Sequence, residues 1–221
     1  MSRALVLAAA VGLSGCMEGV PQAASVDVPA RVAVAEGLII VAGPRGYCVD
    51  LGASRDTAEG ALVVLGSCAA IAQDPALPQP DMAAVLTAAV SAPGRGMKVR
   101  ESAAALGQYF RSDGGRAALA RSGRAADVTI LEDFSRGGAY YLRLRDVGAA
   151  PGPAFEPDYW RALIDIGDRI ITLSVLAPKG RPISRDDGLE TLSGFLQRIL
   201  SENRGIMAGN TLRADVGVDT G

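Results

Sequence analysis

An alternation of apolar and polar side chains in the second half of the chain constrains the fold more than any other feature. It runs through residues 128–134, 139–146, 160–166 and 169–176. Successive side chains of a strand point to opposite faces, so this period of two predicts strands that each bury one face. Gly167-Asp168 supplies a tight turn between the last two segments. The pattern therefore predicts an antiparallel meander.

Two of these segments also predict which side chains share a face. In residues 140–145 one face is apolar, and Arg143 and Arg145 share the other. In residues 170–175 we expect Ile171, Leu173 and Val175 on the buried side.

The first half of the chain predicts further strands. Residues 31–42 read as a hairpin that turns at Glu36-Gly37, and residues 47–50 follow a turn at 43–46. A polar loop through Arg55 and Asp56 leads to the apolar run 61–67, which is short enough to be a buried strand. Residues 83–92 are ambiguous between strand and helix, and Pro93-Gly94 favours a strand.

Helices are predicted between the strands and at the end of the folded region. Residues 101–110 place Leu106, Tyr109 and Phe110 on one face, and Asp113 to Gly115 ends that helix. A weaker helix covers 116–121. In the last helix Ser184 and Asp187 form a capping box. Its apolar stripe consists of Leu189, Leu192, Leu196, Ile199 and Leu200.

Together these elements predict an α+β fold, an antiparallel β-sheet with packed helices (an α/β sandwich) and a closing C-terminal amphipathic helix. In the second half, a strand, a glycine turn, a strand ending in a proline loop and a final helix follow one another. This order resembles the Mog1/PsbP-type α/β/α sandwich. The resemblance implies an accessory or binding protein rather than an enzyme.

The first residues are typical of a secretory signal. Arg3 provides a positive charge, and residues 4–12 form an uncharged apolar stretch too short to span a bilayer as a helix. We expect residues 1–15 to be a signal peptide, 16–30 a tether that begins at a lipidated cysteine, 31–205 a single α+β domain, and 206–221 a flexible tail.

The end of this leader, Leu13-Ser14-Gly15-Cys16, resembles the lipobox of bacterial lipoproteins. The resemblance implies cleavage before Cys16 and diacylglycerol on its thiol. With a further acyl chain on the new amino terminus, attachment to a membrane is stable. Met17, rather than Asp, follows the cysteine, which in Gram-negative lipoproteins implies the outer membrane, on its periplasmic face. An ordinary secreted protein with a chance cysteine is the alternative.

The two remaining cysteines, Cys48 and Cys68, lie 20 residues apart. In an oxidising compartment we expect a structural disulfide between them, which stabilises the fold by about 3 kcal/mol. A redox-active pair is the other interpretation, but the spacing is not that of a C-x-x-C motif. Two unpaired thiols are the third possibility.

Composition excludes several classes of function. The formal net charge is -2 and no Lys/Arg run occurs, so nucleic-acid binding is excluded. The chain has no histidine, which excludes Ser/His/Asp and Cys/His catalysis and His-bound zinc. We therefore predict no catalytic residue, no metal site and no cofactor.

Carboxylate pairs leave one catalytic alternative open. They occur at Glu132-Asp133, at Asp165 with Asp168, and at Asp186-Asp187. Such pairs serve glycoside hydrolysis in other proteins when their spacing in space is right. The only lysines are Lys98 and Lys179, and Lys179 lies in a proline-rich turn that would not desolvate its amine.

Arg143 and Arg145, with Arg136 and Arg161 elsewhere in the meander, suggest a cationic strip. Together with Tyr141 and Trp160 we expect this strip to form a binding surface for an anionic or protein partner. The functional hypothesis is a membrane-anchored, non-catalytic module that binds an envelope protein or a cell-wall component. A hydrolase that works without histidine and a structural or assembly factor are the alternatives.

Overall fold

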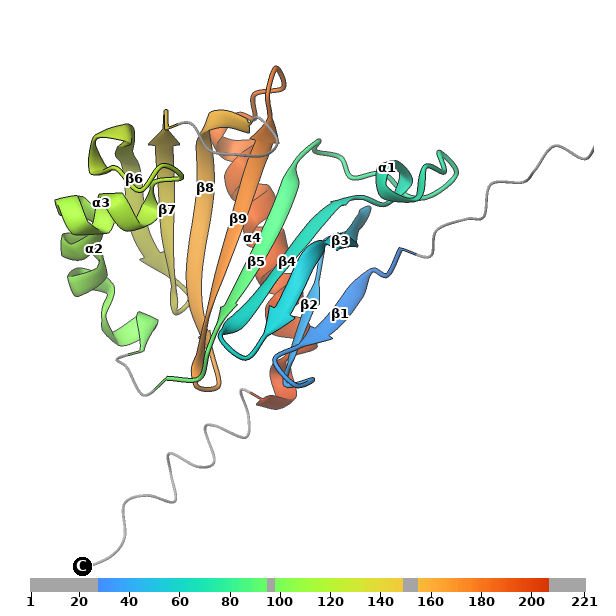
Figure 1. The fold of residues 1–221 in the computed structure, drawn as a ribbon, viewed down its shortest axis with the longest axis horizontal. Coiled ribbons are helices and arrows are strands. Elements are labelled where there is room, and N and C mark those ends of the chain that lie inside the picture. Colours follow the sequence, from blue (N-terminus) through green and yellow to red (C-terminus); the bar gives the residue numbers. More distant parts are fainter. Residues whose placement is uncertain (1–27, 95–97, 149–154, 207–221) are drawn as a thin grey trace, which may run out of the picture.

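The computed structural model describes residues 28–94, 98–148 and 155–206 (Figure 1). The expected signal peptide, Cys16, most of the tether and almost all of the tail lie outside these residues. The strands are β1 (Arg31–Val34), β2 (Ile39–Ala42), β3 (Tyr47–Thr57), β4 (Gly60–Ser67), β5 (Val85–Ser91), β6 (Val128–Arg136), β7 (Ala139–Asp146), β8 (Phe155–Ile166) and β9 (Arg169–Pro178). The α-helices are α1 (Cys68–Ala72), α2 (Ala103–Arg111), α3 (Asp113–Leu119) and α4 (Arg185–Glu202).

The architecture confirms the predicted α+β fold. Seven strands form one sheet in the order β3-β4-β5-β9-β8-β7-β6, and β1 and β2 form a separate hairpin. Every pair of neighbours in the large sheet is antiparallel. The predicted meander is β6 to β9, and β5 joins the first half of the chain to it by pairing with β9.

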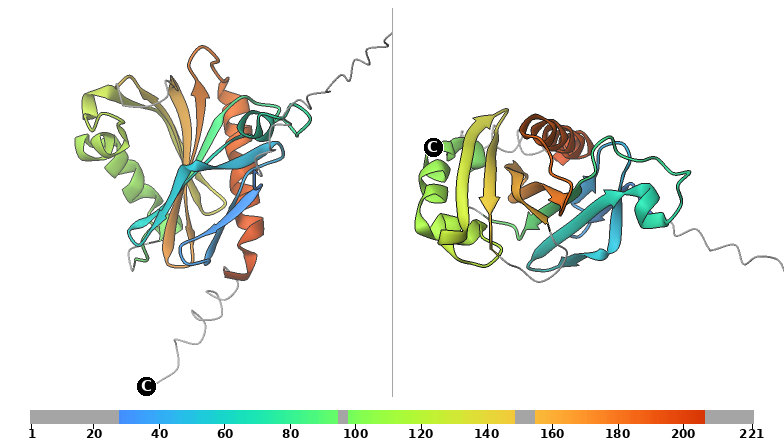
Figure 2. Two further views of the ribbon diagram at one scale, coloured as in Figure 1. Left: turned by 45° about the vertical axis from the view of Figure 1, so that its right-hand side comes forward. Right: turned by 90° about the horizontal axis from the view of Figure 1, so that it is seen from above.

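The sheet has helices on both faces, but they cover different strands. α4 and the β1-β2 hairpin lie on one face, while α2 and α3 lie on the other face at the β6 end (Figure 2). Two apolar cores result. The α4-side core includes Leu65, Leu173, Leu192 and Phe195, and the α2-side core includes Phe110, Leu142, Leu144 and Tyr159.

Helix α4 begins and packs as its sequence predicts. The Ser184 hydroxyl accepts a hydrogen bond from the Asp187 N–H at 3.1 Å, and the same hydroxyl donates to the Asp187 carboxylate at 2.6 Å. Leu192, Leu196 and Ile199 are buried as expected. Phe195, which the predicted stripe omits, is fully buried beside them because the apolar face is wider than the leucines alone indicate.

The expected disulfide between Cys48 and Cys68 is present. It joins the start of β3 to the first residue of α1 and closes a loop with a sequence separation of 20. Both cysteines are buried. The bond therefore holds one edge of the large sheet to the short helix beside it.

Several local predictions are wrong. The polar segment 51–57 continues β3 beyond an irregularity after Asp50, because its backbone pairs with β4 although its side chains face solvent. Asp113 begins α3 rather than ending a helix, since the Ser112 hydroxyl accepts from the Gly115 N–H. Tyr109 is 50% exposed.

Candidate binding surface

The predicted cationic strip forms an ion-pair network with balanced charge. Arg143 and Arg145 lie on one face of β7, as expected, and both contact Asp158, at 3.5 Å and 2.6 Å. Glu132 contacts Arg143 at 3.6 Å and Arg185 at 2.7 Å, and Arg185 also pairs with Asp186. Three arginines thus meet three carboxylates at the start of α4, so no excess positive charge remains there.

The aromatic part of the predicted surface is buried. Tyr141 is 4% exposed and Trp160 is 3% exposed, and both belong to the α4-side core. Tyr141 stacks on Phe134 with 4.9 Å between ring centroids, and the indole N–H of Trp160 donates to the carbonyl of Arg185 at 3.0 Å. The prediction that these two residues form a binding surface is therefore wrong, because α4 covers the face on which they lie.

The acidic pair on β6 does not act as a pair. Glu132 faces Arg143 and Arg185 on the α4 side. Asp133 faces the opposite side, where it pairs with Arg111 and accepts a hydrogen bond from the hydroxyl of Tyr140. Burial, followed by the hydrogen bond to Asp133, raises the pKa of Tyr140 above its ordinary value. Consecutive strand residues point to opposite faces, so the two carboxylates are separated by the sheet.

Apart from Asp168, whose exposed side chain makes no hydrogen bond or ion pair with a described residue, the other candidate catalytic groups have structural partners. The carboxylate of Asp165 accepts from the Val99 N–H at 2.7 Å, and Asp187 closes the cap of α4. The amine of Lys98 donates to the carbonyl of Gly167 at 2.7 Å, and Lys179 lies 3.9 Å from Glu156. In the part of the chain that the structure describes, no group of three or more Cys, Asp or Glu residues has the geometry to hold a metal ion.

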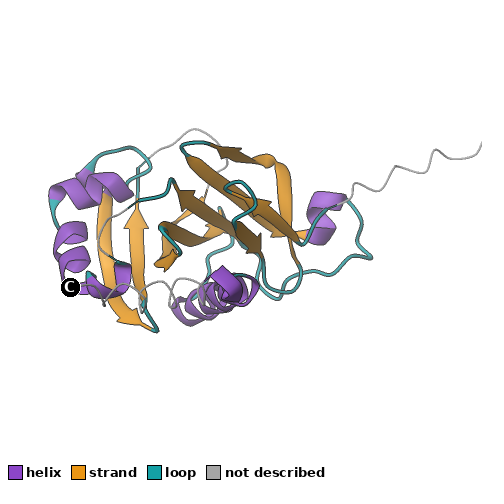
Figure 3. Ribbon diagram, turned by 90° about the horizontal axis from the view of Figure 1, so that it is seen from below, coloured by secondary structure: helices purple, strands orange, loops and turns teal. Residues whose placement is uncertain are grey.

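A surface that the sequence did not predict lies on the face away from α4. No helix covers that face between α2–α3 at one end and α1 at the other, within the described residues (Figure 3). We call it the open face. It is formed by β4, β5, β8 and β9, and its side chains are Leu62, Val64, Val85, Thr87, Ala89, Arg161, Leu163, Thr172, Ser174 and Leu176.

The apolar content of the open face is unusual for a solvated sheet. Leu62, Val64, Val85 and Ala89 are only partly buried and belong to neither apolar core. An antiparallel sheet with one face in water normally carries polar side chains on that face. The open face therefore carries a partly exposed apolar area that neither apolar core covers.

Strand register aligns a polar row across the middle of the open face. Arg161 pairs with Ser174, Ser174 with Thr87, and Thr87 with Val64. The hydroxyls of Thr87 and of Thr172 make no hydrogen bond to another described residue. The centre of the face therefore offers hydrogen-bonding groups that are free to meet a ligand.

Arg161 is the charged residue of this row. Its Nε donates to the Ser174 hydroxyl at 3.3 Å, and its guanidinium lies over the ring of Tyr159, 5.4 Å from the centroid. No carboxylate of the described residues lies within 4.0 Å of it. Burial raises the pKa of Tyr159, which leaves that ring neutral beneath the cation. Stacking holds the guanidinium in place and leaves its two terminal nitrogens open to an anion.

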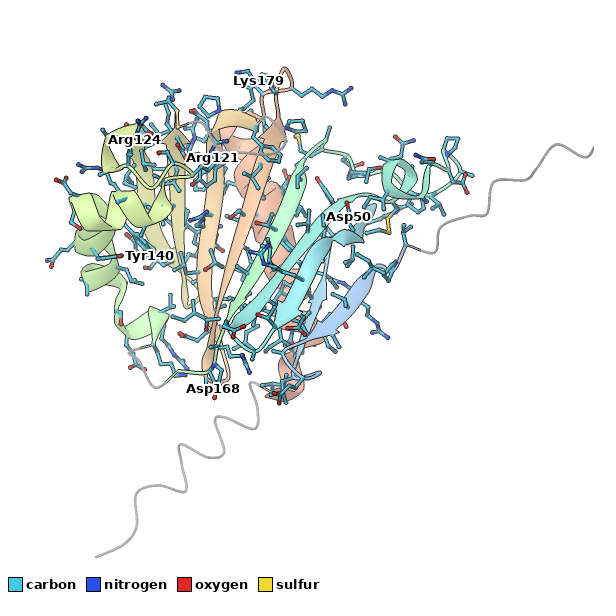
Figure 4. The ribbon with its side chains drawn as sticks, in the orientation of Figure 1. Asp50, Arg121, Arg124, Tyr140, Asp168 and Lys179 are labelled. Carbon is cyan, nitrogen blue, oxygen red and sulfur yellow. A yellow bond between two sulfur atoms is a disulfide. The ribbon has the colours of Figure 1, made fainter. Side chains whose placement is uncertain are left out.

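The nearest carboxylate in the same cross-strand row is that of Asp133, which lies two strands from Arg161 through Leu142. Two strand spacings are roughly 10 Å, and Asp133 is already paired with Arg111. Figure 4 shows Asp50, the carboxylate at the other end of this row, at the end of the face opposite to Tyr140. Neither carboxylate forms an ion pair with Arg161.

The sequence indicated Arg161 as a candidate binding residue, but it did not indicate on which face of the sheet its side chain lies. In the predicted strip it stood with Arg136, Arg143 and Arg145, and the structure separates it from them: Arg136 lies over Phe134 and Tyr141 on the α4 side. The alternation in β8 did carry the signal, because Trp160 and Arg161 are neighbours and only one of them can face α4.

A hollow of about 430 Å³ lies beside β6, between α2, α3 and the loop that follows them. Its arginines differ from Arg161, because Arg111 pairs with Asp133 and Arg116 with Asp113.

None of the described helices combines the length and the apolar composition of a membrane span. Comparison of the chain with protein-family models and with curated proteins finds no match. The open face thus combines, on one surface, partly exposed apolar side chains with an arginine that has no carboxylate partner among the described residues.

Proposed function

We propose that the chain is a lipid-anchored protein of the bacterial cell envelope, held by Cys16 at the periplasmic face of the outer membrane, whose folded domain binds an envelope component without catalysing a reaction. The open face is the binding surface in this proposal.

The proposed location rests on the leader and on the disulfide. The apolar stretch 4–12 and the lipobox Leu13 to Cys16 support export and lipidation, and Met17 supports the outer membrane. The Cys48–Cys68 disulfide fits an oxidising compartment outside the cytoplasm.

The observation that carries the binding role is the open face itself. It combines partly exposed apolar side chains with one stacked arginine that has no carboxylate partner among the described residues. Buried or half-buried charges without a partner cost free energy, so such an arginine is explained best by a ligand that supplies the opposite charge. Of the acidic residues with catalytic potential, Glu132, Asp133 and Asp165 are occupied by structural contacts instead.

The anchor is tested by Cys16→Ala. We expect the unsubstituted protein in the membrane fraction after cell lysis, and the variant in the soluble fraction, because the thiol that carries the lipid is gone. Cys48→Ser is the control, since it removes a thiol without touching the lipobox. Membrane retention of Cys16→Ala would contradict the proposed anchor.

The binding surface is tested by photo-cross-linking in living cells. A photoreactive amino acid at Thr87 places the probe at the centre of the open face, and the same amino acid at Glu190 places it on the exposed side of α4. We expect a cross-linked adduct by mass spectrometry from position 87 and not from position 190. Equal adducts from both positions, or adducts from position 190 alone, would contradict the open face as the binding surface.

A further inference from the structure

We infer that the open face binds a single anionic amphiphile, with the carboxylate or phosphate of its head group on Arg161 and its hydrocarbon part across β5 and β4. This inference rests on the proposed binding role of the same face.

The head-group position follows from Arg161. Stacking on Tyr159 fixes the plane of the guanidinium, and the bond from Nε to Ser174 fixes its rotation. The two terminal nitrogens then form a fork that matches two oxygens of a carboxylate or a phosphate. Ser174 is 3% exposed, so this arrangement is built into the sheet and is not a loose surface contact.

The hydrocarbon position follows from the residues beyond the polar row. Starting from Arg161 on β8, the sheet continues through β9 to β5 and β4, where Ala89 on β5 and Leu62 and Val64 on β4 are partly exposed. Three strand spacings, roughly 14 Å, separate Arg161 from Val64. A ligand with one charged end and an apolar chain of that reach satisfies the arginine and covers the apolar side chains together.

Other occupants fit the face less well. An added peptide strand pairs with the edge of a sheet through its backbone, whereas the open face lies in the middle strands. A second copy of the chain packed face to face would leave both Arg161 side chains without an anion, because none of the side chains that form the open face is a carboxylate.

The test uses the full-length chain with Cys16→Ser, which has no thiol for lipidation and needs no detergent. Binding of dodecanoate and of dodecyl phosphate is measured by isothermal titration calorimetry below the critical micelle concentration. These two probes distinguish a fatty-acid head group from a phosphate head group. Inorganic phosphate and dodecyltrimethylammonium complete the set, as an anion without a chain and a chain with the opposite charge.

We expect at least one anionic probe to bind, and Arg161→Gln to weaken that binding about tenfold or more, because a charge-assisted bidentate contact is lost. Arg145→Gln, on the α4 side, is the matched control and leaves the affinity unchanged. Thr172→Glu adds a carboxylate diagonally next to Arg161, keeps the arginine, and is expected to reduce binding to a similar extent. This second variant decides the question if Arg161→Gln does not fold.

Equal affinity of the Arg161→Gln variant, the Thr172→Glu variant and the protein with neither substitution would overturn the inference. So would inorganic phosphate that binds as tightly as dodecyl phosphate, or dodecyltrimethylammonium that binds as tightly as dodecanoate. Failure of all probes, with cross-links from position 87 and membrane attachment intact, would reject the amphiphile and leave the proposed function standing.

Discussion

Asn203 connects the end of α4 to the edge of the small sheet. Its side chain accepts from the Ile40 N–H at 2.9 Å and donates to the Ile40 carbonyl at 2.8 Å, as a neighbouring strand would. It also donates to the Ile199 carbonyl at 2.8 Å and is 1% exposed. One side chain therefore satisfies backbone groups of both a helix and a strand.

Replacement of Asn203 by alanine is expected to lower the free energy of unfolding by about 2 kcal/mol or more. The reason is that buried backbone groups of Ile40 lose their partners. Urea unfolding measures the change. Arg204→Ala, at the exposed neighbouring position, is the control and is expected to stay within about 0.5 kcal/mol of the parent. Equal effects of the two substitutions would contradict the role of Asn203.

Tyr47 gives the stability a dependence on alkaline pH. Its hydroxyl donates to the Met82 carbonyl at 2.6 Å, and burial raises the pKa of Tyr47 to about 12 from its ordinary value of 10.0. The folded state therefore holds this proton more tightly than the unfolded state. The stabilisation is complete below pH 10.0 and is lost as the pH rises toward about 12.

For Tyr47 alone, the loss of stability between pH 9 and pH 11 is about 1 kcal/mol. Urea unfolding at several pH values measures it. Tyr47→Phe has no proton to lose at this position, so its stability should fall less steeply over the same range. Identical pH profiles for the two proteins would show that Tyr47 does not titrate as the structure implies.

At the residue scale, the sequence predicted covalent partners better than it predicted which side chains are buried. Cys48 and Cys68 form the predicted disulfide, and apart from Cys16 they are the only cysteines of the sequence. Tyr141 and Trp160 were predicted on the surface and are buried, because a period of two fixes which residues share a face but not which face a helix covers.

At the scale of elements, the close contact between α4 and β8 depends on one glycine. A Cβ atom at Gly188 would lie 2.6 Å from the Cδ1 atom of Trp160, which is held by its own hydrogen bond to Arg185. In the same helix, a Cβ atom at Gly194 would have no atom within 4 Å. The two glycines share one helix and differ in what surrounds them.

Gly188→Ala is expected to destabilise the protein by about 1–3 kcal/mol, because α4 or Trp160 must move. Gly194→Ala is expected to stabilise it by about 0.5–1 kcal/mol, because alanine loses less backbone freedom in a helix. Thermal or urea unfolding measures both changes. Two shifts of the same sign would mean that the contact with Trp160 does not limit the helix.

The disulfide is a second prediction for the elements, because it ties β3 to α1. Cys48→Ser, Cys68→Ser and the double variant should each lose about 3 kcal/mol of stability, since each removes the same cross-link. Urea unfolding with and without reductant measures this. Unequal losses in the two single variants, or a further loss on reduction of either one, would count against a shared bond.

Elements with a strong period were predictable, and those without one were not. The strands of the meander and α4 overlap the segments that the alternation and the capping box predicted, although β8 begins at Phe155 and not at Trp160. The last seven residues of β3 were missed, because a strand whose side chains face solvent has the composition of a loop. α1 was missed because five residues are too few to show a helical period.

For the whole molecule, the two cores share their central strands. Alternate residues of β7 enter opposite cores: Tyr141 lies on the α4 side, and Leu142 on the α2 side. The same is true of Trp160 and Tyr159 in β8. A change in one core therefore acts on strands that support the other.

Phe195→Ala and Phe110→Ala, one in each core, should each cost about 3–5 kcal/mol and leave a single unfolding transition. Trp160 is the only tryptophan, so its fluorescence follows the α4-side core, while far-UV circular dichroism follows all strands and helices. The two probes should give the same midpoint. An earlier dichroism transition in Phe110→Ala, with unchanged fluorescence, would show that the α2-side core unfolds by itself.

The pairing of β5 with β9 also sets an order for folding. β5 ends at Ser91 and its partner begins at Arg169, so under the proposed export the intervening residues must cross the membrane before the ladder can form. During that interval β5 presents an unpaired backbone edge to any other strand it meets. Protection from aggregation is therefore needed most before the last strand has crossed, and the strand that completes the sheet ends that need.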